Sequence, residues 1–194
     1  FGYRGRMDER IDLSRTVRNK QYRYIRNYMP HKIYGQYIEY LWKAPSMLSW
    51  EKEYFSGRLN EIQSRFWETK PAEELYDVEA DPYNVTNLAE DPRYKYVLEE
   101  LREANRQWII SSYDAGFIPE PMLFEISKTS TPYDYAHSGK YDIRRTLETA
   151  EMASSNDPKN YEILLERLLD KDPVIRYWAI MGIIVSGQLS EKIT

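Results

Sequence analysis

The chain has 194 residues, of which 42% are hydrophobic and 30% charged, and its formal net charge is −4 at pH 7. This composition allows a packed core and excludes wholesale disorder, and the length suits one ordinary domain or a small domain with an appendage. The absence of cysteine excludes disulfides, thiolate metal sites and a cysteine nucleophile. No apolar run approaches the roughly 18 residues that cross a membrane, so no membrane span is expected.

Tyrosine is unusually common: the chain has 18 tyrosines and 5 tryptophans but only 5 phenylalanines. Such side chains combine apolar bulk with a polar group, which suits half-buried surfaces, interfaces and carbohydrate-facing surfaces as well as ordinary core packing.

Positive charge gathers at the beginning of the chain, where residues 1–30 contain eight basic and three acidic side chains. Arginine binds sulfate, phosphate and carboxylate through two parallel hydrogen bonds, so this segment suits an anionic partner or, alternatively, a strand pair with a basic solvent face. Nucleic acid is not an expected partner, because the chain is acidic overall, with a pI of about 5.4, and its basic residues do not form a continuous stripe.

Apolar and polar residues alternate over 13–18 and 22–28, which predicts a β-hairpin with a turn at Asn19-Lys20, after a strand-like lead-in from Phe1. A third strand is predicted over 74–78. The spacing of these strands in the sequence does not match the strand–helix–strand units that build a parallel sheet. The sequence therefore predicts an α+β fold with a small antiparallel sheet.

Helices are predicted between and after these strands. An aromatic-rich insertion contains three, over 36–43, 46–55 and 60–67, the last capped by Asn60 with Ile62, Phe66 and Trp67 facing inward. A long amphipathic helix over 92–115 begins at Asp91-Pro92, and Gly116 is its expected C-cap. Its apolar stripe, which includes Trp108, should cover one face of the sheet.

The remainder divides into a turn-rich connector, 121–139, and an all-helical segment, 140–194, which follow a first domain of residues 1–120. Helices are expected over 141–153, 157–169 and 173–186, with Asp-Pro opening the last two and Gly187 ending the third. The last two resemble a HEAT-type repeat, and one such unit cannot bury its faces alone, so either a longer array or packing against the first domain is expected.

The sequence contains no self-contained active site: it has two histidines, no glycine-rich phosphate loop and no nucleophile elbow. No catalytic residue and no metal ligand is therefore assigned. Asp77, Asp81 and Asp91 are better explained as turn and cap residues than as metal ligands.

Hydrogen-bond donors gather in the loop 26–36, which contains Pro30 and Gly35 and follows the second predicted strand. Such loops on a rigid scaffold often carry recognition. A lone histidine usually has a structural role, but the basic residues around His31 and its place in a loop favour a contact with a ligand to the same degree.

The stretch ELYDVEADPYNVTNLAEDPRY resembles a signature near the C-terminus of the type I, formylglycine-dependent sulfatases of the alkaline-phosphatase-like superfamily. RMDERIDLSRTVRNKQYRYIRNYMP is similar to a block that precedes this signature in bacterial sulfatases. The segment RNYMPHKIYGQ is similar to one in a heparan N-sulfatase-like subgroup, whose members carry HEAT-like helices after the sulfatase fold. The resemblance covers most of residues 1–120.

This resemblance implies a sulfatase C-terminal subdomain, a short antiparallel sheet packed by a long helix, which closes one side of the substrate pocket. The parent enzyme would hydrolyse sulfate esters or sulfamates of a sulfated carbohydrate and would be periplasmic or extracellular in a bacterium. Formylglycine and calcium are expected in an N-terminal catalytic domain, the partner of this chain, because no C/S-x-P/A-x-R motif occurs here.

The resemblance also implies which residues reach the substrate: His31, Lys32 and Tyr34, then Arg26 and Gln36. They would bind sulfate or the sugar's hydroxyl and carboxylate groups without performing bond chemistry. Because the chain begins at Phe1 without a Met or a leader, we expect a fragment that is inactive alone. The alternative is a non-catalytic interaction module built from the tyrosine-rich sheet and the HEAT-like helices.

Overall fold

The computed structural model describes residues 1–188 and has an α+β fold, as the sequence predicts. The chain forms two compact units, Phe1–Leu98 and Glu99–Thr194, and the boundary between them falls within the long helix α4 (Lys95–Ser111). The domain limits expected at residues 120 and 139, and the packing of the long helix on the sheet, stay predictions.

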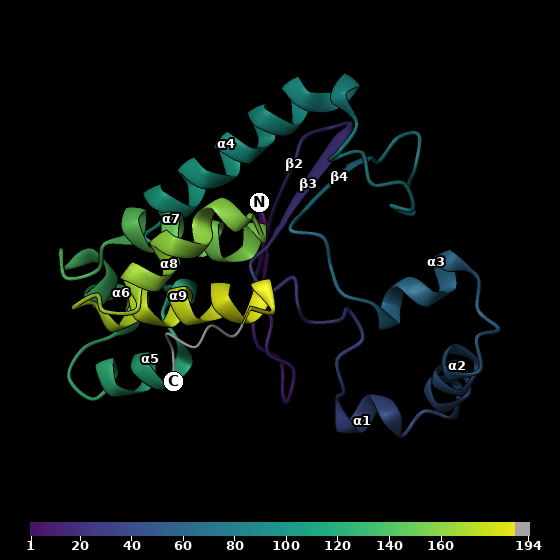
Figure 1. The fold of residues 1–194 in the computed structure, drawn as a ribbon, viewed down its shortest axis with the longest axis horizontal. Helices are drawn as coiled ribbons and strands as arrows, with labels where there is room; N and C mark the ends of the chain where they lie inside the picture. The colour runs from purple at the N-terminus through teal and green to yellow at the C-terminus, as the bar shows by residue number, and fades with distance from the viewer. Residues whose placement is uncertain (189–194) are drawn as a thin grey trace. The chain divides into compact units, whose positions relative to one another are not determined.

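The first unit contains a four-stranded antiparallel sheet in the order β1-β2-β3-β4 (Figure 1). The strands are β1 (Gly2–Arg4), β2 (Ser14–Arg18), β3 (Tyr22–Asn27) and β4 (Glu73–Asp77). The predicted turn between β2 and β3 is confirmed, because the side chain of Asn19 accepts hydrogen bonds from the N–H groups of Gln21 and Tyr22 at 3.0 and 2.6 Å.

The far edge of β4 is completed by the Asn87 side chain rather than by a fifth strand. Its Oδ1 accepts from the Leu75 N–H at 2.9 Å, its Nδ2 donates to the Glu73 carbonyl at 3.1 Å, and the Leu88 N–H donates to the Leu75 carbonyl at 2.8 Å. Since a buried strand edge needs partners for its backbone groups, the ELYD and NLA parts of the signature form one structural device.

The three aspartates of this signature hold turns and caps, as predicted. Each carboxylate accepts a hydrogen bond from a backbone N–H a few residues further along: Asp77 from Glu79 and Ala80, Asp81 from Thr86, and Asp91 from Arg93. These bonds satisfy donors that the turns and the helix beginning would otherwise leave free.

The insertion between β3 and β4 contains α1 (Glu39–Trp42), α2 (Pro45–Phe55) and α3 (Glu61–Ser64), which gather together in Figure 1. Asn60 forms the predicted cap, a full capping box with Gln63. Trp67 is buried, but Ile62 is 57% exposed, so its inward placement was wrong. The reason is that α3 gives way to a 3₁₀ turn after Ser64, whose tighter winding takes Trp67 off the stripe that Ile62 would share.

One buried indole organises the insertion and accounts for much of its aromatic content. The Trp67 ring has four aromatic neighbours at centroid distances of 5.1–5.9 Å: Trp42, Trp50, Tyr54 and Phe66. Edge-to-face and offset contacts of this kind add to the stabilisation from burial alone.

Helix α4 ends at Ser111, earlier than predicted, and Gly116 is not its C-cap. Tyr113 adopts the left-handed conformation instead, with φ 49°, and the Ser112 hydroxyl donates to the Trp108 carbonyl at 2.7 Å. Gly116 lies in a 3₁₀ turn, Ala115–Phe117, which the Asp114 side chain caps. Local hydrogen bonds from Ser and Asp therefore end the helix before the glycine is reached.

The range expected to be a connector contains two short helices, α5 (Glu120–Ile126) and α6 (Pro132–His137). A proline in the first turn of each helix helps the helix to begin, because its fixed φ suits that position. No helix within residues 1–188 is long and apolar enough to cross a membrane.

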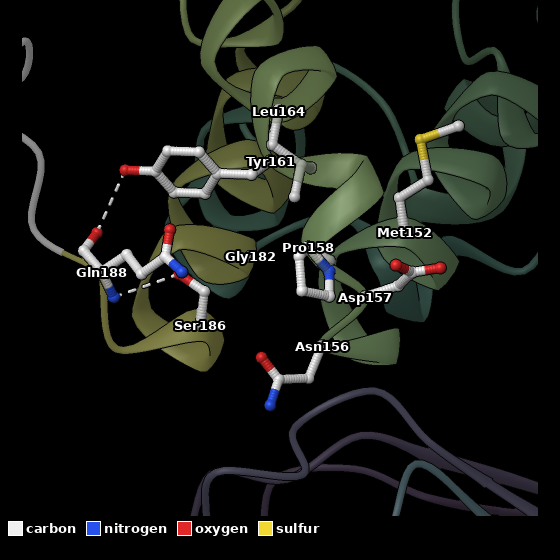
Figure 2. Close-up of a pocket in the computed structure, with 10 residues that line it drawn as sticks. Met152, Asn156, Asp157, Pro158, Tyr161, Leu164, Gly182, Ser186 and Gln188 are labelled. Carbon is white, nitrogen blue, oxygen red and sulfur yellow. Dashed lines mark hydrogen bonds between the residues drawn. The ribbon is translucent and has the colours of Figure 1, made fainter.

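Three further helices make the core of the second unit: α7 (Ile143–Ser155), α8 (Tyr161–Arg167) and α9 (Pro173–Ser186). Both α7 and α8 pack on α9, and Gly182 marks the close approach, since an added Cβ there would lie 2.6 Å from Leu164 Cδ1 and 2.9 Å from Ala153 Cα. Beside Gly182 lies a cavity of about 20 Å³, room for one water (Figure 2). The all-helical segment is confirmed as far as residue 188, with its Asp157, Asp172 and Gly187 caps, and its predicted end at residues 189–194 lies outside the described residues. The HEAT-type repeat stays a prediction.

Candidate functional site

One face of the sheet carries polar side chains from all four strands. Residues two apart on a strand share a face, and the register pairs Ser14 with Asn27, Thr16 with Ile25, and Arg18 with Arg23. On this face lies a cavity of about 390 Å³, within the size range of small-ligand sites. Its lining includes Gly2, Arg4, Ser14, Thr16, Arg18, Arg23, Ile25, Asn27, Tyr34, Lys70 and Glu74.

Glu74, only 4% exposed, is the centre of a hydrogen-bond network at one end of this cavity. Its Oε1 accepts from Asn27 Nδ2 at 2.6 Å and from the Tyr34 hydroxyl at 2.9 Å, and its Oε2 accepts from the Tyr76 hydroxyl at 2.6 Å. Ser14 Oγ extends the network by donating to Asn27 Oδ1 at 2.7 Å. These donors compensate a carboxylate that would otherwise be costly to bury.

Burial, reinforced by the Glu74 carboxylate, raises the pKa of both tyrosines in this network, Tyr34 and Tyr76. Both hydroxyls therefore stay protonated near neutral pH and act as donors to Glu74. Tyr34 joins the network to the loop that the sequence singled out.

A buried ion pair lies beside the same end of the cavity. Lys70 Nζ is 3.0 Å from both carboxylate oxygens of Asp12, and the two side chains are 1% and 0% exposed. Arg4 Nη1 is 3.7 Å from Asp12 Oδ2. Burial lowers the pKa of Lys70 and Asp12 opposes that shift, so the ammonium depends on its partner to stay charged.

The loop 26–36 is held rigidly against the end of the insertion. The Gly35 N–H donates to the Phe66 carbonyl at 2.7 Å, and the Lys70 N–H donates to the Pro30 carbonyl at 3.0 Å. An added Cβ at Gly35 would lie 2.2 Å from the Phe66 ring, so the chain can pass there only without a side chain. A pinned loop of this kind presents its polar side chains in fixed positions.

The structure places four of the five predicted substrate-binding residues together in this loop. Tyr34 lines the cavity, and Lys32 is exposed. His31 Nδ1 and Gln36 Nε2 are buried atoms without a hydrogen-bond partner within residues 1–188. Burial, with Lys32 and Lys70 nearby, lowers the pKa of His31, so its neutral imidazole predominates at pH 7. Of these four residues only Tyr34 lines the cavity, whereas His31, Lys32 and Gln36 lie outside its lining.

Arg26, the fifth predicted residue, is directed away from this group. It is 6% exposed, Nη1 donates to the Ala72 carbonyl at 3.1 Å, and its guanidinium lies 5.5 Å from the Tyr28 ring centroid. Because Ile25 and Asn27 line the cavity, alternation along β3 sends Arg26 to the opposite face of the sheet. These contacts fit a packing role.

Arg18 and Arg23 line the cavity, although the sequence alone marks them only as part of the basic opening. Neither makes a side-chain hydrogen bond or an ion pair in the described part of the chain, residues 1–188. The register across the predicted hairpin, which makes them direct neighbours, is the signal that could have identified them.

Within the part of the chain that the structure describes, no three His, Cys, Asp or Glu side chains come together as a metal site. The aspartates of the signature, Asp77, Asp81 and Asp91, hold turns and caps instead. The calcium that the resemblance implies is expected in another domain, and this stays a prediction.

No family model matches the chain. Two curated proteins of Formosa agariphila, each named Ulvan-active sulfatase, are similar to it. The first is 39% identical over 119 residues, which are 61% of this chain and 20% of the relative. The second is 32% identical over 108 residues, 56% of this chain and 19% of the relative. The chain thus spans about a fifth of the length of these relatives. The resemblance to sulfatases is confirmed.

Proposed function

We propose that this chain is the C-terminal region of a sulfatase that hydrolyses sulfate esters or sulfamates of a sulfated carbohydrate. The observation that carries this proposal is the similarity to two sulfatases, 39% identical over 119 residues in one case. The sulfatase-like region of the chain completes the fold of the parent enzyme, which is periplasmic or extracellular. A catalytic domain elsewhere in the parent supplies formylglycine and calcium, which perform the chemistry at the sulfate.

The contribution of this chain is substrate recognition by the loop 26–36. Lys32 supplies an exposed cation, and His31 and Gln36 supply polar atoms that have no partner within residues 1–188. Charge-assisted hydrogen bonds to sulfate or carboxylate are stronger than neutral ones, so these side chains discriminate anionic from neutral sugars. Tyr34 is committed to Glu74 and sets the position of the loop.

The test is release of inorganic sulfate from sulfated oligosaccharides by the product of the full-length gene, with Lys32→Ala as the variant. Loss of one charge-assisted contact raises KM about tenfold and leaves kcat within about twofold. Lys52→Ala is the matched control, since Lys52 is an exposed lysine of α2 in the same unit, and it leaves both constants unchanged.

Two results would count against the proposal. If both lysine variants change KM equally, then net charge matters and the loop does not. If the full-length product releases no sulfate from any sulfated sugar or sulfamate, the interaction-module alternative replaces the enzyme.

A further inference from the structure

The cavity on the sheet has a second end, which the loop 26–36 does not reach. Arg18 and Arg23 are direct neighbours across the β2–β3 hairpin, and both line the cavity. Ser14, at the Glu74 end, lies four residues earlier on β2, about 13 Å away at the rise of an extended strand. The cavity therefore extends along the strand from the Glu74 network to an arginine pair.

This arginine pair is unusual because nothing in the described residues compensates it. Like charges directly opposite each other on a sheet destabilise the pair of strands. Arg18 is exposed and Arg23 half-buried, and neither has a carboxylate or carbonyl partner within residues 1–188. Two adjacent guanidinium groups offer parallel N–H donors that match the oxygens of a sulfate or a carboxylate, so an oxyanion would remove the repulsion.

The floor between the two ends is low and partly apolar. Thr16 and Ile25 lie opposite each other and are half-exposed, and Gly2 of β1 faces Thr16. A side chain at Gly2 would place its Cβ 3.0 Å from Thr16 Cγ2, so glycine keeps this part of the cavity open. An apolar floor between two polar ends suits a sugar ring, whose hydrogens face one way while its charged substituents reach outward.

We propose that Arg18 and Arg23 form a second anion subsite, which binds the sulfate or carboxylate of a neighbouring unit of a sulfated carbohydrate. The subsite makes the protein select chains with repeated negative charges over singly charged sugars. This inference rests on the proposed function, because the first anionic group is the one that the loop 26–36 presents for hydrolysis.

The experiment compares two substrates of the full-length gene product: a monosulfated monosaccharide, and a monosulfated disaccharide with a uronate as its second unit. In Arg18→Gln/Arg23→Gln the KM for the disaccharide rises about tenfold or more, while kcat stays within about twofold. The monosaccharide constants do not change. Lys20→Gln is the matched control: Lys20 is exposed in the same hairpin turn and does not line the cavity.

The inference is overturned if the double variant affects both substrates equally, or neither. Because removal of repelling charges should not unfold the hairpin, the unfolding temperature of each variant is measured first. If the double variant is destabilised, Arg18→Gln alone, at the exposed position, must still raise the disaccharide KM.

A binding measurement separates this inference from the proposed function. If the protein hydrolyses neither sugar, calorimetric titration with the same disaccharide decides. Binding that weakens about tenfold in the double variant but not in Lys20→Gln supports the subsite even though the sulfatase proposal has failed. Unchanged binding in the double variant, or no binding by the unaltered protein, overturns it.

Discussion

Replacement of Lys70 by Met should be among the most damaging single changes in the first unit. Met keeps the apolar stem and removes the ammonium, so Asp12 is left as a buried carboxylate. Its remaining partners are the Leu13 N–H, which donates to Oδ1 at 3.0 Å, and Arg4, which is 3.7 Å away and 41% exposed. Breaking a buried pair costs about 3–5 kcal/mol, and the nearby Arg4 places the loss at the lower end, about 3 kcal/mol. The control is Lys43→Met in the same unit: that lysine pairs with Glu39 at 3.0 Å, but the side chains are 70% and 65% exposed, so about 0.5 kcal/mol is lost.

The assay is urea unfolding followed by tryptophan fluorescence, because Trp42, Trp50 and Trp67 report on the first unit. A loss of about 3 kcal/mol corresponds to a fall of roughly 6–12 °C in the unfolding temperature of a chain of this size. Asp12→Asn combined with Lys70→Met removes both charges and should recover most of the loss. If Lys70→Met costs no more than Lys43→Met, the Asp12–Lys70 pair is not desolvated and the reasoning fails.

Three further outcomes are expected. Asn87→Ala removes the partner of the β4 edge and lowers the free energy of unfolding by about 1–3 kcal/mol in urea titrations, and no change would show that water replaces the amide. Gly182→Ala drives a Cβ to 2.6 Å from a leucine carbon of α8 and lowers it by about 1–3 kcal/mol, whereas Gly5→Ala, whose Cβ meets nothing within 4 Å, is neutral; equal effects would contradict the close approach. The lowered pKa of His31 means that its contribution to stability is intact above its ordinary value of about 6.5 and is lost as pH falls through its folded pKa; an NMR titration in His137→Gln, which leaves one imidazole signal, should give a midpoint below 6.5, and a midpoint at or above it would refute the burial argument.

Local chemistry could be predicted from the sequence wherever a few neighbouring residues complete a hydrogen-bonded unit. Asp91, Asp157 and Asp172 each begin a helix or 3₁₀ turn followed by proline, and Asn60 forms its capping box, because the donors and acceptors lie within three residues of one another. The strands could likewise be predicted, because the alternation of apolar and polar side chains is also a pattern of neighbouring residues. The motifs that carry the sulfatase resemblance are largely these local devices.

What the tertiary structure decided are contacts between residues far apart in the chain. Tyr34 reaches Glu74 across 40 positions, and Asp12 meets Lys70 across 58. A pattern of neighbouring residues cannot reveal contacts across such separations in the sequence. The sequence could therefore identify Tyr34 as a candidate but not its hydrogen bond to Glu74, and it could not identify the Asp12–Lys70 ion pair. Arg26 has the same chemistry as Arg23, yet strand register alone buries the first and leaves the second facing the cavity. Which face a strand buries depends on what packs against it, and that physical choice belongs to the whole fold.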